Sequence, residues 1–134
     1  MSTSIIGRSL LALAAVAASL VLPSMASADP VPTSVKISQS AQFATPGELN
    51  TQVTLSCTAG YGYSVNVTVV QPQSWGFTLF GGGWTFGQCT GQQQKVAVAV
   101  YTFGGTWLLG DASASVAACA GPCDSDTRQI HIGL

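Results

Sequence analysis

Charge and histidine are scarce in this chain of 134 residues. Only 7% of the residues are charged, with four lysines and arginines, five aspartates and glutamates, and a single histidine. A chain with so few cations has no run of basic residues that could neutralise several phosphates, so we expect no nucleic acid partner. It also lacks a second histidine, a carboxylate pair and an activated nucleophile, so we expect no catalytic residue and no enzyme activity.

The N-terminal 28 residues differ from the rest of the chain. Arg8 is the only charge before an apolar run over residues 10–22, and Ala26-Ser27-Ala28 follows that run. A basic start, a short apolar core and small residues at the exit are typical of a secretory signal peptide. The run is shorter than the roughly 20 residues that cross a bilayer, so we expect no transmembrane anchor after cleavage. We therefore predict a signal peptide over 1–28 and one secreted domain over 29–134.

The surface of this mature domain must be largely uncharged. Its three cations are Lys36, Lys95 and Arg128, against five acids, which gives a formal charge of −2. The remaining polar surface is built from serine, threonine, glutamine, asparagine and glycine, and such a surface repels its neighbours only weakly. We expect a secreted or cell-envelope-associated module whose partner is an unidentified protein or envelope component.

All four cysteines lie in the mature domain, and export would place them in an oxidising compartment. An even number in a small exported domain predicts two disulfides. Cys119 and Cys123 enclose Ala-Gly-Pro, which favours a turn, so we pair them locally and pair Cys57 with Cys89. The rival pairing joins Cys89 to Cys119.

Alternation of apolar and polar residues is the main pattern of the domain. It is clearest over residues 51–71, where two alternating runs flank a Gly60-Tyr61-Gly62 turn, and it predicts a half-buried antiparallel hairpin. The aromatic-rich stretch 75–89 predicts a second, looser hairpin with Gly81-Gly82-Gly83 at its tip. Residues 95–103 are apolar on both faces and predict an interior strand.

Strands with turns between them, and no helical pattern after the signal, predict an all-β domain of two packed sheets. Gly47-Glu48 followed by Val53-Thr54-Leu55-Ser56-Cys57-Thr58 resembles the second strand of an immunoglobulin-like domain. Four further motifs occur in the order seen in small exported immunoglobulin-like proteins of actinobacteria: Cys57, Cys89-Thr90-Gly91, Gly110 with Ala112 and Ala114, and Arg128 with Ile130 and Ile132. The resemblance implies an immunoglobulin-like two-sheet sandwich of about seven or eight antiparallel strands with two disulfides.

The aromatic residues allow two interpretations. Large aromatics usually fill the core of a small domain, and we favour this for Trp75, Phe77 and Trp84. Aromatics beside a glycine-rich segment can instead stack on sugars, line an apolar cleft or contact a membrane. Under that interpretation the ligand-binding residues are Trp75, Phe80, Trp84 and Trp107, and the protein carries a small apolar molecule or a sugar, or touches a membrane.

Three titratable residues could suggest further chemistry. His131 lies between two inward-facing isoleucines and should therefore point to solvent, away from any catalytic serine. Asp124 and Asp126 could offer two oxygens to calcium, but a calcium site needs six or more ligands, so we expect a solvated turn. The cysteine spacing does not complete a zinc site either, and we predict no metal and no cofactor.

Overall fold

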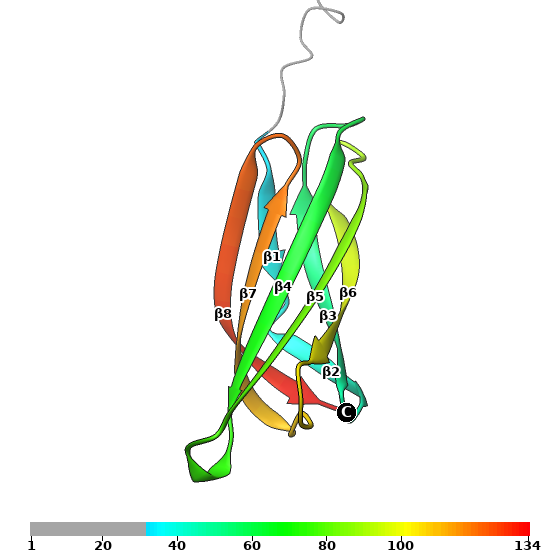
Figure 1. The fold of residues 1–134 in the computed structure, drawn as a ribbon. Coiled ribbons are helices and arrows are strands. Elements are labelled where there is room, and N and C mark those ends of the chain that lie inside the picture. The colour runs from blue at the N-terminus through cyan, green and yellow to red at the C-terminus, as the bar shows by residue number, and fades with distance from the viewer. Residues whose placement is uncertain (1–31) are drawn as a thin grey trace, which may run out of the picture. The chain divides into compact units, whose positions relative to one another are not determined.

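Residues 32–134 are described by a computed structural model, and within this range the chain forms eight β-strands and one short 3-10 helix (Figure 1). The elements are β1 (Ser34–Ile37), β2 (Ser40–Thr45), β3 (Glu48–Ser56), β4 (Gly62–Pro72), η1 (Ser74–Gly76), β5 (Thr78–Gln88), β6 (Gln94–Thr102), β7 (Gly110–Cys119) and β8 (Cys123–Gly133). The all-β prediction is confirmed. The predicted signal peptide over 1–28 lies outside the described residues, as does the side chain of Trp75.

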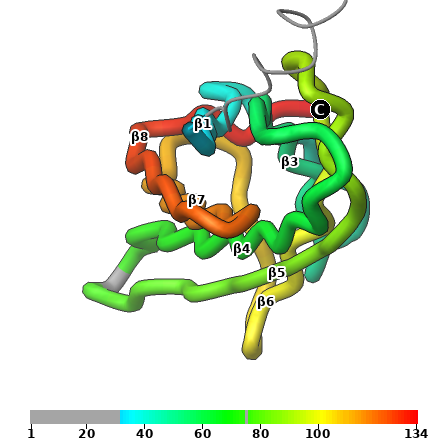
Figure 2. Tube along the Cα trace, turned by 90° about the horizontal axis from the view of Figure 1, so that it is seen from above, coloured from blue at the N-terminus to red at the C-terminus, as the bar shows by residue number. Residues whose placement is uncertain are grey.

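The strands close into a seven-stranded barrel, seen along its axis in Figure 2. Backbone pairing runs in the order β3, β2, β8, β7, β4, β5 and β6, and β6 returns to β3 along an antiparallel ladder from Glu48 opposite Tyr101 to Leu55 opposite Gln94. β1 pairs with the far half of β3. The predicted two-sheet immunoglobulin-like sandwich is therefore wrong, because a sandwich keeps two separate sheets with free edges.

The predicted hairpin over residues 51–71 is also wrong in its pairing. β3 pairs with β1, β2 and β6, whereas β4 pairs with β5 and β7. The alternation itself is correct, since Val53 and Leu55 of β3 and Val65 and Val67 of β4 are all buried. Two strands with this pattern can bury their apolar faces in the same core although they lie on different sides of a barrel. Alternation therefore predicts which face of a strand is buried, but not which strand it pairs with.

The glycine run 81–83 lies inside a continuous strand and not at a hairpin tip. β5 pairs with β4 along its whole length, from Thr78 opposite Pro72 to Gln88 opposite Gly62. A Cβ atom at Gly81 would collide with the indole ring of Trp107, and one at Gly83 would collide with the backbone carbonyl of Ala99. These glycines therefore let β5 approach β6 and the core closely.

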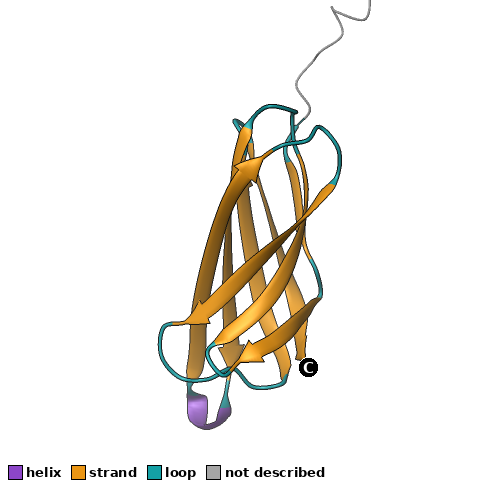
Figure 3. Ribbon diagram, turned by 90° about the vertical axis from the view of Figure 1, so that its right-hand side faces the viewer, coloured by secondary structure: helices purple, strands orange, loops and turns teal. Residues whose placement is uncertain are grey.

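The barrel interior is filled mainly by aliphatic side chains from alternate strand positions. Trp107 is the largest of them and is 2% exposed, although it comes from the connection between β6 and β7. The Gln71 side chain holds this connection, because its amide accepts from the backbone amide of Leu108 at 2.9 Å and donates to the Leu108 carbonyl at 2.8 Å. Figure 3 shows the connections gathered at the two ends of the barrel, with η1 at one end.

Both predicted disulfides are present, Cys57–Cys89 and Cys119–Cys123, and the rival pairing does not form. The first joins the end of β3 to the end of β5, and the second closes the turn between β7 and β8. Two disulfides are compatible with an extracellular protein. Within residues 32–134 we find no helix with the length and hydrophobicity that a membrane span requires.

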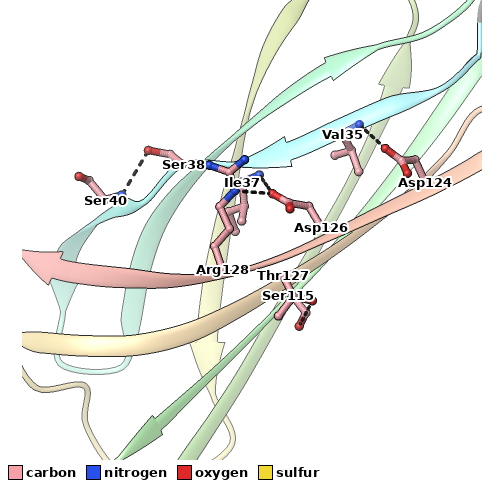
Figure 4. A network of polar contacts seen from close by, with 9 residues as sticks. All are labelled: Val35, Ile37, Ser38, Ser40, Ser115, Asp124, Asp126, Thr127 and Arg128. Atoms are coloured by element: carbon pink, nitrogen blue, oxygen red, sulfur yellow. Dashed lines mark hydrogen bonds and ion pairs between the residues drawn. The ribbon is translucent and has the colours of Figure 1, made fainter.

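Side-chain carboxylates take the place of a backbone ladder between β1 and β8 (Figure 4). Asp124 accepts the backbone N–H of Val35 at 2.9 Å, and Asp126 accepts that of Ile37 at 3.1 Å. Both aspartates lie on β8 and are half-buried, so the predicted solvated turn is wrong. Among the residues that the structure describes, no group of three or more His, Cys, Asp or Glu side chains could hold a metal ion.

Candidate functional site

Six exposed aromatic side chains gather on the outside of the barrel around β5 and β6. On β5, residues at even positions point outward, because side chains alternate along a strand, and three of them are aromatic. Trp84 and Phe86 are each 68% exposed, although the domain has a large aliphatic core. We define the aromatic face by these residues and their neighbours: Phe77, Phe80, Trp84, Phe86, Tyr101 and Phe103.

Trp84 and Phe86 form a stacked pair within the aromatic face, which we call the platform. Their ring centroids lie 5.4 Å apart, and the ring planes are inclined by only 21°. Both residues lie on one strand, which holds the two rings in register without a partner molecule. Both residues are largely exposed to solvent, and neighbouring exposed aromatic side chains are characteristic of binding sites.

A shallow groove of about 660 Å³ runs beside the platform, over the outer surface of β4, β7 and β8. Gly82 leaves room for this groove, because the outward-facing row of β5 has no side chain between Phe80 and Trp84. The ring of Phe103 lies next to Gly82. The floor is built from small and polar residues. Those with polar side chains are Asn66, Thr68, Ser115, Ser125 and Thr127.

The strand register arranges this floor in rows. Asn66 of β4 lies directly opposite Trp84, and Thr68 lies opposite Gly82. On the far side, the hydroxyl groups of Ser115 and Thr127 are 3.2 Å apart and hydrogen-bonded. No charged side chain lines the groove. The site therefore offers hydroxyl and amide groups beside an aromatic wall.

A second groove of about 370 Å³ lies on the other side of Trp84, between β5 and β6. It is lined by Thr85, Ala97 and Tyr101, among others, and it too lacks charged residues. Trp84 thus separates two uncharged grooves and is accessible from both. The outward face of β6 is exposed here, so the prediction that residues 95–103 form an interior strand holds only for the face of Val96, Val98 and Val100.

The structure separates the residues that the sequence analysis grouped as a ligand site. Phe80 and Trp84 belong to the aromatic face, but Trp107 is buried in the barrel, where its indole nitrogen has no hydrogen-bond partner among the described residues. The predicted cleft that combines Trp84 with Trp107 is therefore wrong. So is the prediction that Phe77 and Trp84 fill the core, because Trp107 takes the interior space beside Gly81.

Sequence reasoning missed Phe86, Tyr101 and Phe103 as members of this surface. The signal for Phe86 was present, because Phe80, Gly82, Trp84 and Phe86 have the same parity and share one face of any continuous strand. Placing a hairpin tip at residues 81–83 hid that row. Phe103 could not be found in this way, since it follows β6 in an irregular connection.

His131 points to solvent as predicted, with its side chain 68% exposed. Its Nδ1 atom lies 3.5 Å from Oδ1 of Asp111, whose side chain is 90% exposed. A pair so open to water does not fix the imidazole as nucleophilic catalysis requires.

Comparison with known proteins gives little further information. No protein-family model matches the chain, and no curated protein matches it. Among solved structures, it is similar to the sporulation control protein Spo0M from Bacillus subtilis at 12% identity and a TM-score of 0.32. The match covers 79% of this chain and 50% of that chain, so the chain spans about half the length of that protein. A similarity this low indicates no function, and membership of the actinobacterial family stays a prediction.

Proposed function

We propose that this protein is a secreted, non-enzymatic binding module that holds a neutral carbohydrate chain on its aromatic face. The observation that carries the proposal is the stacked Trp84–Phe86 platform, 68% exposed at each residue, beside an uncharged groove of hydroxyl and amide groups. The predicted signal peptide and the two disulfides support export. A polysaccharide of the cell envelope would be a partner of the required kind.

The two parts of the site match the two kinds of surface on a sugar. The C–H face of a pyranose ring is apolar and packs against the flat indole of Trp84. The hydroxyl groups at the ring edge then lie over Asn66 and Thr68, which can each donate and accept hydrogen bonds. An extended groove favours a chain of sugars over a single ring, because several rings can bind side by side.

The charge of the site separates this function from membrane binding. Proteins that bind anionic lipid surfaces place lysine or arginine beside the apolar residues. Neither groove beside Trp84 has such a residue in its lining. An uncharged hydroxyl-rich ligand therefore fits better than a bilayer.

Binding of wild-type protein and a Trp84→Ala variant to neutral polysaccharides tests this function. A panel of cellulose, starch, mannan and soluble β-glucan would be used, with affinity electrophoresis and tryptophan fluorescence as readouts. We expect at least one polysaccharide to retard the wild-type protein and to shift its emission. Trp84→Ala should weaken binding about tenfold or more, since one stacked ring is worth roughly 1.4 kcal/mol.

Tyr61→Ala is the matched control, because Tyr61 is an exposed aromatic at 44% outside the aromatic face. It should bind as wild type does. Equal binding by Trp84→Ala and wild type would refute the proposal, as would sedimentation with neutral lipid vesicles and no retention by any polysaccharide.

A further inference from the structure

All three lysine and arginine residues of the described chain line one groove. Lys36, Lys95 and Arg128 are far apart in sequence, yet they meet at a groove of about 340 Å³ on the opposite part of the barrel from β4. Its other lining residues are Ile37, Ser38, Gln39, Gln52, Thr54 and Gln93, and no acidic residue is among them. The sequence suggested no basic patch because the fold, and not the chain order, brings the three cations together.

The register explains how the two lysines become neighbours. Lys36 of β1 lies opposite Thr54 of β3, and Thr54 lies opposite Lys95 of β6. Neighbouring strands are about 4.8 Å apart, so the two lysine Cα atoms are roughly 10 Å apart on the same outer face. Two flexible ammonium groups can therefore converge above Thr54.

Arg128 reaches the same groove from β8. It passes beside Ile37, where β1 and β8 lack a backbone ladder, and Figure 4 shows its side chain directed from β8 toward β1. Its Nε atom donates to Asp126 Oδ2 at 2.9 Å, and its side chain is 33% exposed. The terminal amino groups of the guanidinium have no acceptor among the described residues. The arginine is thus oriented by Asp126 with its remaining donors free.

We propose that this groove binds a phosphate group. Three cations surround it, and Asp126, which already accepts from Ile37, balances only one of them. Gln52, Gln93 and Ser38 add neutral donors to the lining. A tetrahedral dianion with several acceptor oxygens uses such a donor set more fully than a carboxylate does. The groove holds about 340 Å³ and three cations, so it fits an isolated phosphate group and not the repeated phosphates of a nucleic acid.

This site is independent of the aromatic face. It uses the outer surfaces of β1 and β3, Arg128 of β8 and Lys95 at the start of β6, whereas the aromatic face uses β5 and the far end of β6. Failure of carbohydrate binding would therefore leave the phosphate site untouched, and the reverse also holds.

NMR titration of the isotope-labelled exported protein with inorganic phosphate tests the site, with sodium chloride holding the ionic strength constant. We expect amide shift changes confined to the strands around Lys36, Thr54, Lys95 and Arg128. Lys95→Gln should weaken phosphate binding about tenfold, and Lys95→Arg should restore most of it. Glycerol phosphate and vesicles containing phosphatidic acid form two further arms, which distinguish a soluble phosphate ester from a lipid headgroup.

Ser64→Asp is the matched control, since it changes the net charge by the same amount on the exposed face of β4, away from the groove. It should weaken binding less than twofold. Equal weakening by Ser64→Asp and Lys95→Gln would show a general charge effect and overturn the proposal. Shift changes elsewhere on the barrel, or no shift changes at about 50 mM phosphate, which corresponds to a binding free energy weaker than about 2 kcal/mol, would overturn it as well.

Discussion

The barrel has two seams at which backbone pairing is short, and they are closed in different ways. Between β5 and β6 only Gly81 and Gly82 pair, with Thr102 and Tyr101. Between β2 and β8 the parallel pairing covers only residues 40–42 of β2. Beyond these residues β1 lies next to β8, and its backbone N–H groups donate to carboxylates of β8. The first seam is closed by close backbone packing and a disulfide, and the second by charged hydrogen bonds.

The difference between the seams explains the surface chemistry on either side of the barrel. At the β5–β6 seam the glycines bring the strands together, and the bulky side chains of β5 are left on the outside as the aromatic face. At the second seam, where β1 lies next to β8, the half-buried carboxylate of Asp126 needs a cationic partner. Arg128 supplies it, and this contact draws Arg128 toward the two lysines. The aromatic face and the cation-lined groove therefore each lie beside a seam.

Loss of the Cys57–Cys89 disulfide should have the largest effect on the first seam. This bond joins the ends of β3 and β5 across the start of β6, where β5 and β6 no longer pair. Its residues are 32 positions apart, so the chain-entropy relation predicts a loss of about 3.5 kcal/mol in the free energy of unfolding for the double alanine variant. Guanidinium denaturation of the exported protein measures this loss.

The second disulfide supplies the comparison. Cys119 and Cys123 are only 4 positions apart, and their double alanine variant should lose about 2 kcal/mol. A larger loss for this pair than for Cys57–Cys89 would contradict the view that the first seam depends on its disulfide.

Gly83→Ala should destabilise the same seam by about 3 kcal/mol. The new methyl group would meet the backbone carbonyl of Ala99, which cannot rotate away as a side chain can, so β5 and β6 must separate. Gly82→Ala is the control, because its methyl group would lie 3.4 Å from the Phe103 ring and 3.6 Å from the Val67 carbonyl. We expect a loss below about 1 kcal/mol there. Equal losses in urea denaturation would refute the close-packing account of this seam.

The sequence predicted which residues are buried better than it predicted which strands are neighbours. Alternation identified Val53, Leu55 and Val67 as core residues, and the structure buries all three. It could not show that β3 and β4 belong to different parts of a ring, because a sandwich and a barrel bury the same alternate positions. Closure depends on the β3–β6 ladder, which joins segments about 45 residues apart and has no local signal.

The candidate site was predictable only in part, for a related reason. Phe80 and Trp84 were named as candidates because aromatics next to glycines are locally recognisable, and the structure shows both exposed. Their role in ligand binding stays a prediction. The burial of Trp107 was not predictable, since it depends on the Gln71 side chain fixing a distant connection. The convergence of Lys36, Lys95 and Arg128 likewise requires the cross-strand register, which no short motif encodes.

The last prediction concerns the second seam, where we expect a smaller loss than at the Cys57–Cys89 disulfide or at Gly83. Asp126→Ala removes the acceptor for the Ile37 N–H and the partner of Arg128, so the free energy of unfolding should fall by about 2 kcal/mol. Hydrogen exchange should show a local change, in which the Ile37 amide exchanges faster. The amides of β4, a strand that pairs on both sides, should exchange faster only to the extent that the free energy of global unfolding falls. Asp124→Ala removes a single bond, to Val35, and should cost less. If the Ile37 amide keeps its protection in Asp126→Ala, then the carboxylate does not close this seam, and Arg128 reaches the groove for another reason.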